Sequence, residues 1–290
     1  MKAVVDIGTN TVRMLIGDVG EEGKVKVHAQ FIAEPRLGVG ITKGQLTPEA
    51  VDRTIKALAE FKRITQDYKV EDVIAAATSA VRDAINQTEF VDEVFHKIGW
   101  QVQVISGEKE AELSYTGAVS VLLPLGLPVV IDIGGGSTEV IFARDGEIKG
   151  ISVNVGAVRL HEAAWSQEEL DRKLLPLTRE FTNLGEKISL VAVGGTATTA
   201  AAIHYGITEY SRAAVQGRFL TLESIKKLKD QLKGMPLKER KKIVGLTPKR
   251  ADIIVPGLEI LVRMIELSGE PGITVSDAGI LDGLLLSRRS

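Results

Sequence analysis

Two glycine-rich turns, each beginning two residues after an aspartate, are the segments of this chain best suited to chemistry on phosphate. The sequence reads DIGTNTVR from Asp6 and DIGGGSTE from Asp132. Glycines let a backbone approach phosphate oxygens closely, and successive N–H groups in such a turn form an anion-binding hollow. One such turn alone is equally well explained as a plain hairpin turn. Two turns at matching positions predict a duplicated phosphate-binding loop.

The two aspartates end apolar strands, where a lone carboxylate would be poorly solvated. A buried carboxylate needs a partner, and Mg²⁺ that also contacts phosphate fits here; the alternative is that each aspartate caps its own turn. The chain has no cysteine, and no two of its four histidines are spaced i, i+4. Thiolate chemistry and a zinc-binding helix are therefore excluded, and we expect a hard cation held by carboxylates.

A third candidate is the acidic stretch ISGEKEAELSYTGA at residues 105–118, with Glu108, Glu110 and Glu112. If Glu110 lies at the start of a helix, its carboxylate could orient or deprotonate a water for attack on phosphorus. By residue type alone, these acids are better explained as a solvated first turn of a helix, where the helix dipole favours negative charge.

An internal duplication positions these residues. Residues 3–16 and 129–142 align without a gap, with Arg13 opposite Glu139, and residues 74–84 resemble residues 191–201. Each copy reads as a strand, a glycine-rich turn and a second strand, and then a buried strand that leads into a helix. The duplication predicts two similar α/β halves that face each other across a cleft.

Between the strands, helix starts are marked clearly. Thr47 before Pro48 is an N-cap with proline at the first helical position, and Ser166 with Glu169 forms a capping box. The proline- and glycine-containing segment 124–128 is the expected link between the halves.

The composition is that of a soluble globular protein. Hydrophobic residues are 44% of the 290 residues, charged residues 26%, and the net charge is −2, unlike a strongly basic nucleic-acid binder. Aromatic residues are only 4%, which weakens any case for base stacking. No apolar leader begins the chain, and the longest apolar run, 119–131, is short and broken. We expect a cytoplasmic protein that binds neither nucleic acid nor membrane.

Together, the quoted turns, ATSAVRDA (77–84), ISGEKEA (105–111), RADIIVPG (250–257) and SDAGILDG (276–283) resemble the exopolyphosphatase / guanosine pentaphosphate phosphohydrolase family from residue 3 to about 286. The resemblance implies a duplicated actin-like, ribonuclease-H-like fold shared with sugar kinases and chaperone ATPases. It also implies Mg²⁺-dependent hydrolysis of phosphoanhydrides, with Mn²⁺ as the alternative metal. Glu110 occupies the position of the family's catalytic base.

The resemblance carries further roles over by position. The expected metal ligands are Asp6, Asp132 and Glu139. The expected phosphate-binding residues are Gly8, Thr9, Asn10, Thr11, Arg13, Arg36, Arg82, Gly134, Gly135, Gly136, Ser137 and Thr138. The expected domains are residues 1–120, joined by the C-terminal helix at about 278–290, and residues 121–277.

Two departures from the family pattern matter. Where the family commonly has G-L-R-E-G, this chain has Gly279-Ile280-Leu281-Asp282-Gly283, which puts a nucleotide contact from that arginine in doubt. The chain also stops where longer members continue into a helical HD-type extension, so it resembles a short, two-domain member.

The expected function is Mg²⁺-dependent removal of the terminal phosphate from inorganic polyphosphate, with guanosine pentaphosphate as the alternative substrate. A non-hydrolytic, nucleotide-binding actin-like assembly protein and a sugar or acetate kinase are more distant alternatives. Residues 226–250 hold ten lysines or arginines and two acids. This stretch is either a solvated face or a basic rim that holds polyphosphate. The sequence leaves open whether it faces the cleft and whether the protein forms a homodimer.

Overall fold

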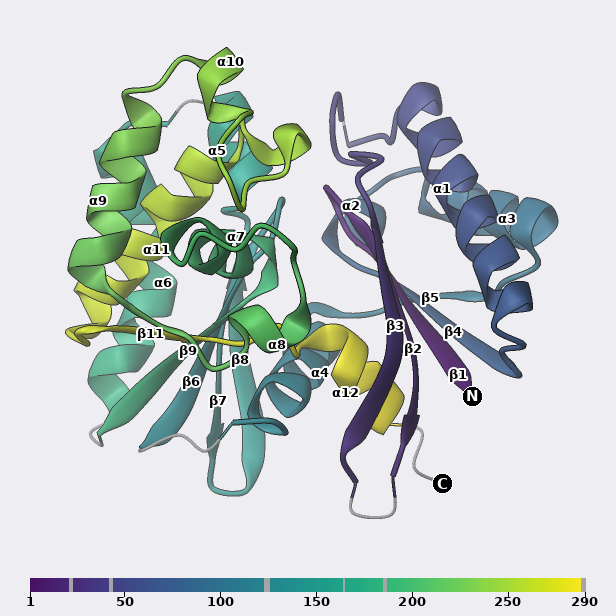
Figure 1. The fold of residues 1–290 in the computed structure, drawn as a ribbon, viewed down its shortest axis with the longest axis horizontal. Helices are drawn as coiled ribbons and strands as arrows, with labels where there is room; N and C mark the ends of the chain where they lie inside the picture. The colour runs from purple at the N-terminus through teal and green to yellow at the C-terminus, as the bar shows by residue number, and fades with distance from the viewer. Residues whose placement is uncertain (21–22, 42–43, 123–125, 164, 185–186, 288–290) are drawn as a thin grey trace. The chain divides into compact units, whose positions relative to one another are not determined.

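The chain divides into two compact units, which Figure 1 shows as ribbons. The computed structural model describes residues 1–20, 23–41, 44–122, 126–163, 165–184 and 187–287. The first unit comprises Met1–Ser120 and Ile280–Ser290, and the second comprises Val121–Gly279. Each unit is a mixed sheet with helices packed against it.

The first unit is a five-stranded sheet in the order β3-β2-β1-β4-β5. Its strands are β1 (Lys2–Ile7), β2 (Val12–Val19), β3 (Val25–Ala33), β4 (Asp72–Ala77) and β5 (Val102–Val104). Its helices are α1 (Pro48–Asp67), α2 (Ser79–Arg82), α3 (Gln87–Ile98), α4 (Gly107–Val119) and α12 (Ile280–Leu286). Along β1, Ala3, Val5 and Ile7 pack into the core under α1 and α3, whereas Val4 packs into the core under α4 and α12 (Figure 1). Because successive side chains of a strand point to opposite faces and both faces of β1 are covered, Ala3, Val4 and Val5 are all apolar.

The second unit is a six-stranded sheet in the order β10-β11-β9-β6-β7-β8. Its strands are β6 (Leu127–Ile133), β7 (Thr138–Arg144), β8 (Glu147–Val153), β9 (Ile188–Val193), β10 (Phe219–Thr221) and β11 (Gly272–Val275). Its helices are α5 (Ala157–Ala163), α6 (Gln167–Leu184), α7 (Gly194–His204), α8 (Arg212–Val215), α9 (Leu222–Lys233), α10 (Leu237–Arg240) and α11 (Ile254–Ser268), with a 3₁₀ turn at Pro248–Arg250. The core joins alternate residues of β6 (Val129, Ile131 and Ile133) to the apolar faces of these helices.

The two sheets repeat one another. When the second sheet is followed from β8, its strands β8-β7-β6-β9-β11 correspond one by one to β3-β2-β1-β4-β5 of the first sheet. Strand β10 is an additional strand at the edge of the second sheet. In the first hairpin Asp6 pairs with Arg13, and in the second Asp132 pairs with Glu139. The duplicated α/β architecture that the sequence predicts is confirmed, whereas the predicted cleft between the halves stays a prediction.

Local helix signals are also confirmed. The Thr47 hydroxyl accepts a hydrogen bond from the Ala50 N–H at 3.3 Å at the start of α1. Ser166 Oγ accepts from the Glu169 N–H at 3.2 Å, and Glu169 Oε2 accepts from the Ser166 N–H at 2.9 Å. Residues 123–125 of the expected link and residues 288–290 of the C-terminal segment lie outside the described residues. Within the described ranges, no helix is long and apolar enough to cross a membrane.

Close packing of α12 against α4 depends on one glycine. A methyl group on Gly283 would overlap the backbone carbonyl of Leu113 in α4. Because a backbone cannot move aside like a flexible side chain, we expect Gly283→Ala to lower the free energy of unfolding by about 3 kcal/mol. Gly107→Ala at the start of α4 is the matched control, since a methyl group there meets nothing within 4 Å. Chemical denaturation of the two variants checks this; equal stabilities would contradict the packing described.

Candidate active site

Both glycine-rich turns are closed by the same backbone hydrogen bond. The Gly8 N–H donates to the Thr11 carbonyl at 3.0 Å, and the Gly134 N–H donates to the Ser137 carbonyl at 3.0 Å. In each case the first glycine directly follows the strand that carries the aspartate, and the turn leads into the next antiparallel strand. The two turns are therefore alike in geometry as well as in sequence.

A segment that follows β3 holds the carbonyls of the first turn. The Thr9 carbonyl accepts from the Gly38 N–H at 2.8 Å, and the Asn10 carbonyl accepts from the Arg36 N–H at 3.1 Å. Arg36 has a left-handed backbone with φ of 57°. That conformation is costly for a residue with a Cβ and is concentrated at functional sites. Arg36 thus lies beside the turn through its backbone, and its role in phosphate binding stays a prediction.

The beginning of α5 holds the carbonyls of the second turn in the same way. The Gly134 carbonyl accepts from the Ala157 N–H at 3.0 Å, and the Gly135 carbonyl accepts from the Val158 N–H at 2.9 Å. The Gly136 carbonyl accepts from the Arg159 Nε at 2.7 Å. In both turns, protein donors therefore occupy carbonyl oxygens.

The amide groups of the turns are arranged differently from the carbonyls. Among the described residues, no protein acceptor bonds the N–H groups that follow the first glycine of each turn: Thr9, Asn10 and Thr11, and Gly135, Gly136 and Ser137. Successive N–H groups without protein acceptors form a hollow of positive potential that suits a phosphate. Each unit thus holds one turn whose amides are available to an anion, and phosphate binding by these turns stays a prediction.

Asp6 forms an ion pair that the sequence analysis did not foresee. Arg13 Nε and Nη2 donate to Asp6 Oδ2 at 3.0 and 2.7 Å, and Asp6 is only 3% exposed. A buried carboxylate that is paired in this way needs no metal to balance its charge. Asp6 Oδ1 is buried and has no hydrogen-bond partner among the described residues. The metal role of Asp6 and the phosphate role of Arg13 stay predictions. Asp6 and Arg13 lie directly opposite each other in the register of the first hairpin, and this spacing could have predicted their ion pair.

Arg82 fixes the orientation of Glu110. Glu110 lies in the first turn of α4, and Arg82 Nη1 donates to its Oε2 at 2.7 Å and to the Ile105 carbonyl at 3.3 Å. The Glu110 side chain is 14% exposed, so it is shielded yet reachable. Glu108 and Glu112 on the same helix are exposed. Glu110 is therefore the acid of this helix whose side chain is both shielded from solvent and bound by an arginine.

Helix α2 links the first turn to Glu110. The hydroxyls of Thr9 and Ser79, the first residue of α2, lie 3.0 Å apart. Arg82, the last residue of the same single helical turn, binds Glu110. The first unit thus brings its candidate phosphate-binding turn and the Glu110 carboxylate to one short helix.

In the second unit, Asp132 and Glu139 lie directly opposite each other in the β6–β7 hairpin. Glu139 is 3% exposed and accepts from Ser152 Oγ at 2.7 Å. The Asp132 carboxylate lies beside Gly194, the first residue of α7. A Cβ atom placed on Gly194 would be 2.8 Å from Asp132 Oδ1. The N-terminus of this helix favours negative charge there.

These two carboxylates fit a magnesium ion. Residues directly opposite in an antiparallel pair have their Cβ atoms about 5 Å apart, and like charges at that distance repel. Mg²⁺ is usually bound by one or two carboxylates together with substrate phosphates and water. Asp132 and Glu139 supply such a pair beside an anion-binding turn, although the described residues contain no cluster of three or more metal-ligating side chains.

Two residues that lie beside the candidate site of the second unit were not predicted as site residues from the sequence. The Arg250 guanidinium lies against Gly195 in the first turn of α7, and its Nη1 is 3.5 Å from Thr199 Oγ1. Ser152 holds Glu139 from the neighbouring strand. The motif RADIIVPG, which begins at Arg250, could have indicated that this arginine lies near the site. Nothing in the sequence distinguishes Ser152 from other serines.

The departure at Leu281 has a structural consequence. Leu281 stands where the family motif has arginine, and it is 8% exposed in the core that α12 shares with α4. An apolar side chain in a core has no group with which to bind a nucleotide. The doubt about a nucleotide contact from this position is therefore upheld.

The matching sheets, with a hairpin turn of the same geometry in each, define a duplicated actin-like α/β protein. The chain belongs to the Ppx/GppA phosphatase family, which it matches over residues 22–289. It is accordingly a hydrolase that acts on phosphoanhydrides.

Individual relatives agree with this assignment. The chain is 33% identical to exopolyphosphatase 2 of Mycobacterium tuberculosis over 310 residues, covering 98% of this chain and 97% of that protein. It is 29% identical to the guanosine-5'-triphosphate,3'-diphosphate pyrophosphatase of Aliivibrio fischeri, of which it spans 58%. Among solved structures it resembles an exopolyphosphatase from Cytophaga hutchinsonii, with a TM-score of 0.88, 29% identity and coverage of 99% of this chain and 96% of that one.

Proposed function

We propose that this protein removes the terminal phosphate from inorganic polyphosphate. The observation that carries the proposal is the pair of matching turns, each with its carbonyls engaged by protein and its amides left for an anion. Each turn offers its amides to phosphate oxygens, whereas nothing in the described turns requires a nucleobase. The mycobacterial relative named exopolyphosphatase 2 supports the same substrate.

In the proposed reaction, Glu110 accepts a proton from water as the water oxygen attacks the terminal phosphorus. The bond between that phosphorus and the bridging oxygen breaks, so one inorganic phosphate leaves and the chain shortens by one unit. The turn amides, with Arg36, stabilise the charge on the transferring oxygens, which is the main task in phosphoryl transfer. Arg82 keeps the Glu110 carboxylate oriented.

Asp132 and Glu139 would hold the metal, for which we propose Mg²⁺, with Mn²⁺ as the alternative. A bound divalent cation supplies neutralisation of charge on phosphate oxygens. Ser152 would orient Glu139 as a metal ligand, because it already binds Oε1. Asp6 remains the third proposed ligand, and its unpartnered Oδ1 is the atom that supports it.

Guanosine pentaphosphate is the second candidate substrate, because the Aliivibrio relative is named for a guanosine nucleotide. The apolar core position of Leu281 weighs against it, since the family arginine is absent there. A non-hydrolytic actin-like assembly protein is a more distant alternative.

Phosphate release from polyphosphate, guanosine pentaphosphate and ATP, measured side by side with Mg²⁺, tests the proposal. We expect kcat/KM for polyphosphate to exceed that for either nucleotide by at least about tenfold, equivalent to ~1.4 kcal/mol of preference in the transition state. A larger kcat/KM for guanosine pentaphosphate would select the second candidate. ATP-dependent sedimentation without phosphate release would instead identify an assembly protein.

A further inference from the structure

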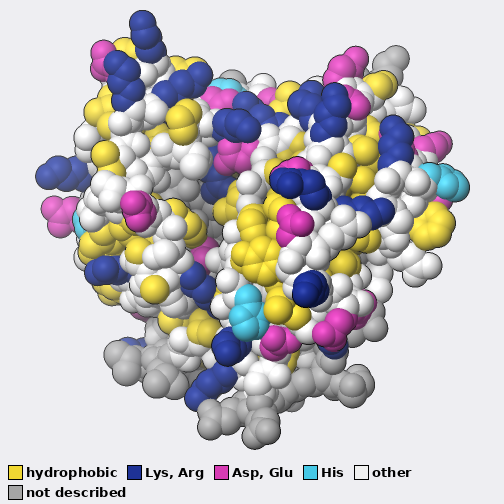
Figure 2. Space-filling model, turned by 45° about the vertical axis from the view of Figure 1, so that its right-hand side comes forward, with side chains coloured by type: hydrophobic (Ala, Val, Ile, Leu, Met, Phe, Trp, Pro, Cys, Tyr) yellow, Lys and Arg dark blue, Asp and Glu magenta, His cyan; other side chains and the backbone are white. Residues whose placement is uncertain are grey.

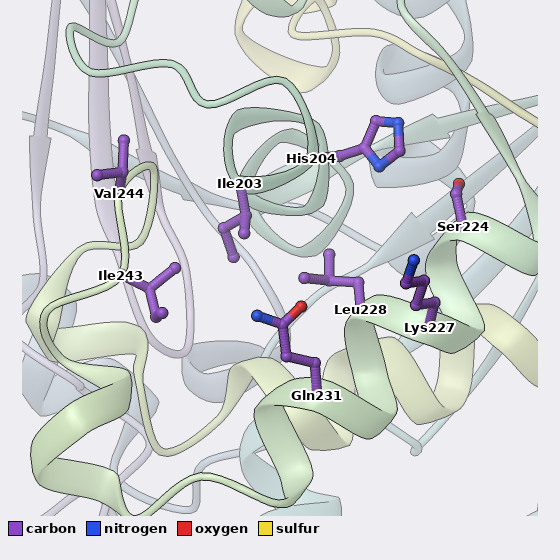
Figure 3. A pocket seen from close by; sticks show the side chains of 8 residues that line it. All are labelled: Ile203, His204, Ser224, Lys227, Leu228, Gln231, Ile243 and Val244. Carbon is purple, nitrogen blue, oxygen red and sulfur yellow. The ribbon is translucent and has the colours of Figure 1, made fainter.

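A hollow in the surface of the second unit lies apart from the candidate active site. It has a volume of 380 Å³ and lies between the end of α7, one face of α9 and the turn after α10 (Figure 3). Gly194, which adjoins Asp132, is the first residue of α7, whereas Ile203 and His204, which line the hollow, are its last two. The hollow and the candidate metal ligands therefore belong to opposite ends of this helix. Its volume is that of a site for a small molecule.

One side of the hollow is polar. In Figure 3 the side chains of His204, Ser224 and Lys227 lie on this side. Ser224 and Lys227 are three residues apart on α9 and therefore share one face of the helix. None of the eight described residues that line the hollow is acidic, and the Ala202 and Ile203 carbonyls at the end of α7 already accept backbone N–H groups. This side therefore suits a ligand group that accepts hydrogen bonds.

Lys227 is the cation of the polar side. Three other lysines of α9 bind acids: Lys226 binds Glu266 at 2.6 Å, Lys229 binds Asp230 at 3.3 Å and Lys233 binds Glu259 at 3.0 Å. Lys227 is exposed and forms no ion pair or hydrogen bond with any described residue. An anionic group of a ligand would give it a charge-assisted hydrogen bond.

The other side of the hollow is aliphatic. Ile203, Ile243 and Val244 lie there in Figure 3, and Leu228 lies between the two sides. Val244 is 52% exposed, and Figure 2 shows yellow side chains among the dark blue ones at the upper left, over α10. A ligand that covered this side would remove apolar surface from water, which is favourable. None of the described lining residues is Phe, Tyr or Trp, so a hydrocarbon chain suits this side better than a ring that needs a stacking partner.

We propose that the hollow binds a small aliphatic carboxylate, with its carboxylate at Lys227 and its hydrocarbon chain against Ile203, Ile243 and Val244. The proposal goes beyond the proposed function and does not depend on it. An inorganic phosphate has no apolar part with which to cover the aliphatic side, and the charge of an organic cation would lie beside Lys227. Only a molecule with an anionic head and an apolar body matches both sides.

Octanoate is the probe that tests the proposal. It is titrated into protein that carries ¹³C in the methyl groups of Ile, Leu and Val, and methyl NMR spectra are recorded. We expect the signals of Ile203, Leu228, Ile243 and Val244 to shift together, while those of strand β1 in the first unit stay in place. A ligand of about ten non-hydrogen atoms predicts a Kd of about 1 mM. Acetate, which lacks the chain, and octylamine, which has the opposite charge, should bind at least about tenfold more weakly.

Two variants test the two sides separately. Lys227→Gln should weaken octanoate binding about tenfold, since it removes the charge of the hydrogen-bond donor. Lys238→Gln is its matched control, because Lys238 is exposed on α10 and does not line the hollow. Val244→Asp should weaken binding by at least about tenfold, because it replaces part of the aliphatic side with a negative charge. Val244 is exposed, so this change leaves the core intact.

Several results would overturn the inference. Equal octanoate affinity in Lys227→Gln and Lys238→Gln would remove the role of the cation. Octylamine that binds as tightly as octanoate would leave an apolar surface without selectivity for anions. Inorganic phosphate that shifts the same methyl signals with equal affinity would make the hollow a plain anion site. Signals that shift with protein concentration alone would instead assign the hollow to contact with a second copy of the chain. Each of these results would leave the proposed phosphate release untouched.

Discussion

Replacement of Glu110 by glutamine is expected to lower kcat by about 10²–10⁴-fold while KM stays nearly the same. Glutamine keeps the shape of the side chain and can still contact Arg82, but it cannot accept a proton from the attacking water. General-base catalysis is typically worth that factor. Steady-state phosphate release gives both constants, and a loss in kcat with unchanged KM identifies an interaction made in the transition state.

Glu108→Gln is the matched control for Glu110, because Glu108 lies on the same helical turn and is exposed. A hydrogen bond from the backbone N–H, together with the Ser106 hydroxyl, lowers the pKa of Glu108. Because the Glu108 side chain faces solvent and Arg82 binds Glu110 instead, its replacement should leave kcat within about twofold. A Glu110→Gln variant that retains more than about a tenth of the turnover would sink the assignment of the base.

Removal of divalent cations is expected to abolish phosphate release, and added Mg²⁺ is expected to restore it. The carboxylates of Asp132 and Glu139 lie opposite each other and would repel a phosphate chain if no cation lay between. Asp132→Ala should therefore prevent saturation by Mg²⁺. Ser152→Ala should keep both ligands and weaken Mg²⁺ affinity by about 10–100-fold, as loss of a group that orients a ligand does.

Isothermal titration of Mg²⁺ into each variant measures these affinities independently of turnover. Full activity in EDTA would refute a metal role. Unchanged Mg²⁺ affinity in Asp132→Ala would refute this choice of ligand while leaving a metal elsewhere open to test.

Local sequence patterns predicted much of the fold, because they depend on neighbours in the chain. The two copies of strand, turn and strand have the register that their alignment implies, and the Ser166–Glu169 capping box forms as expected. The single-turn length of α2 and the extra edge strand β10 were not predictable in this way. They depend on packing within each unit.

Side-chain partners were harder to predict than elements. The sequence did not indicate that Arg13 binds Asp6, or that Arg82 binds Glu110 across 28 positions. Three lysines of the basic stretch are likewise paired with acids, two of which lie on α11. Such pairs follow from tertiary contacts, which a single sequence does not display.

A ³¹P NMR time course of long-chain polyphosphate with the Mg²⁺-loaded protein tests the central claim most directly. Terminal phosphates, internal phosphates and free phosphate give separate signals. Removal of one terminal phosphate at a time predicts that free phosphate grows as internal phosphate declines, while the number of chain ends stays constant until the chains are short. A rising number of chain ends, which indicates cleavage within the chain, or a spectrum without free phosphate would contradict it.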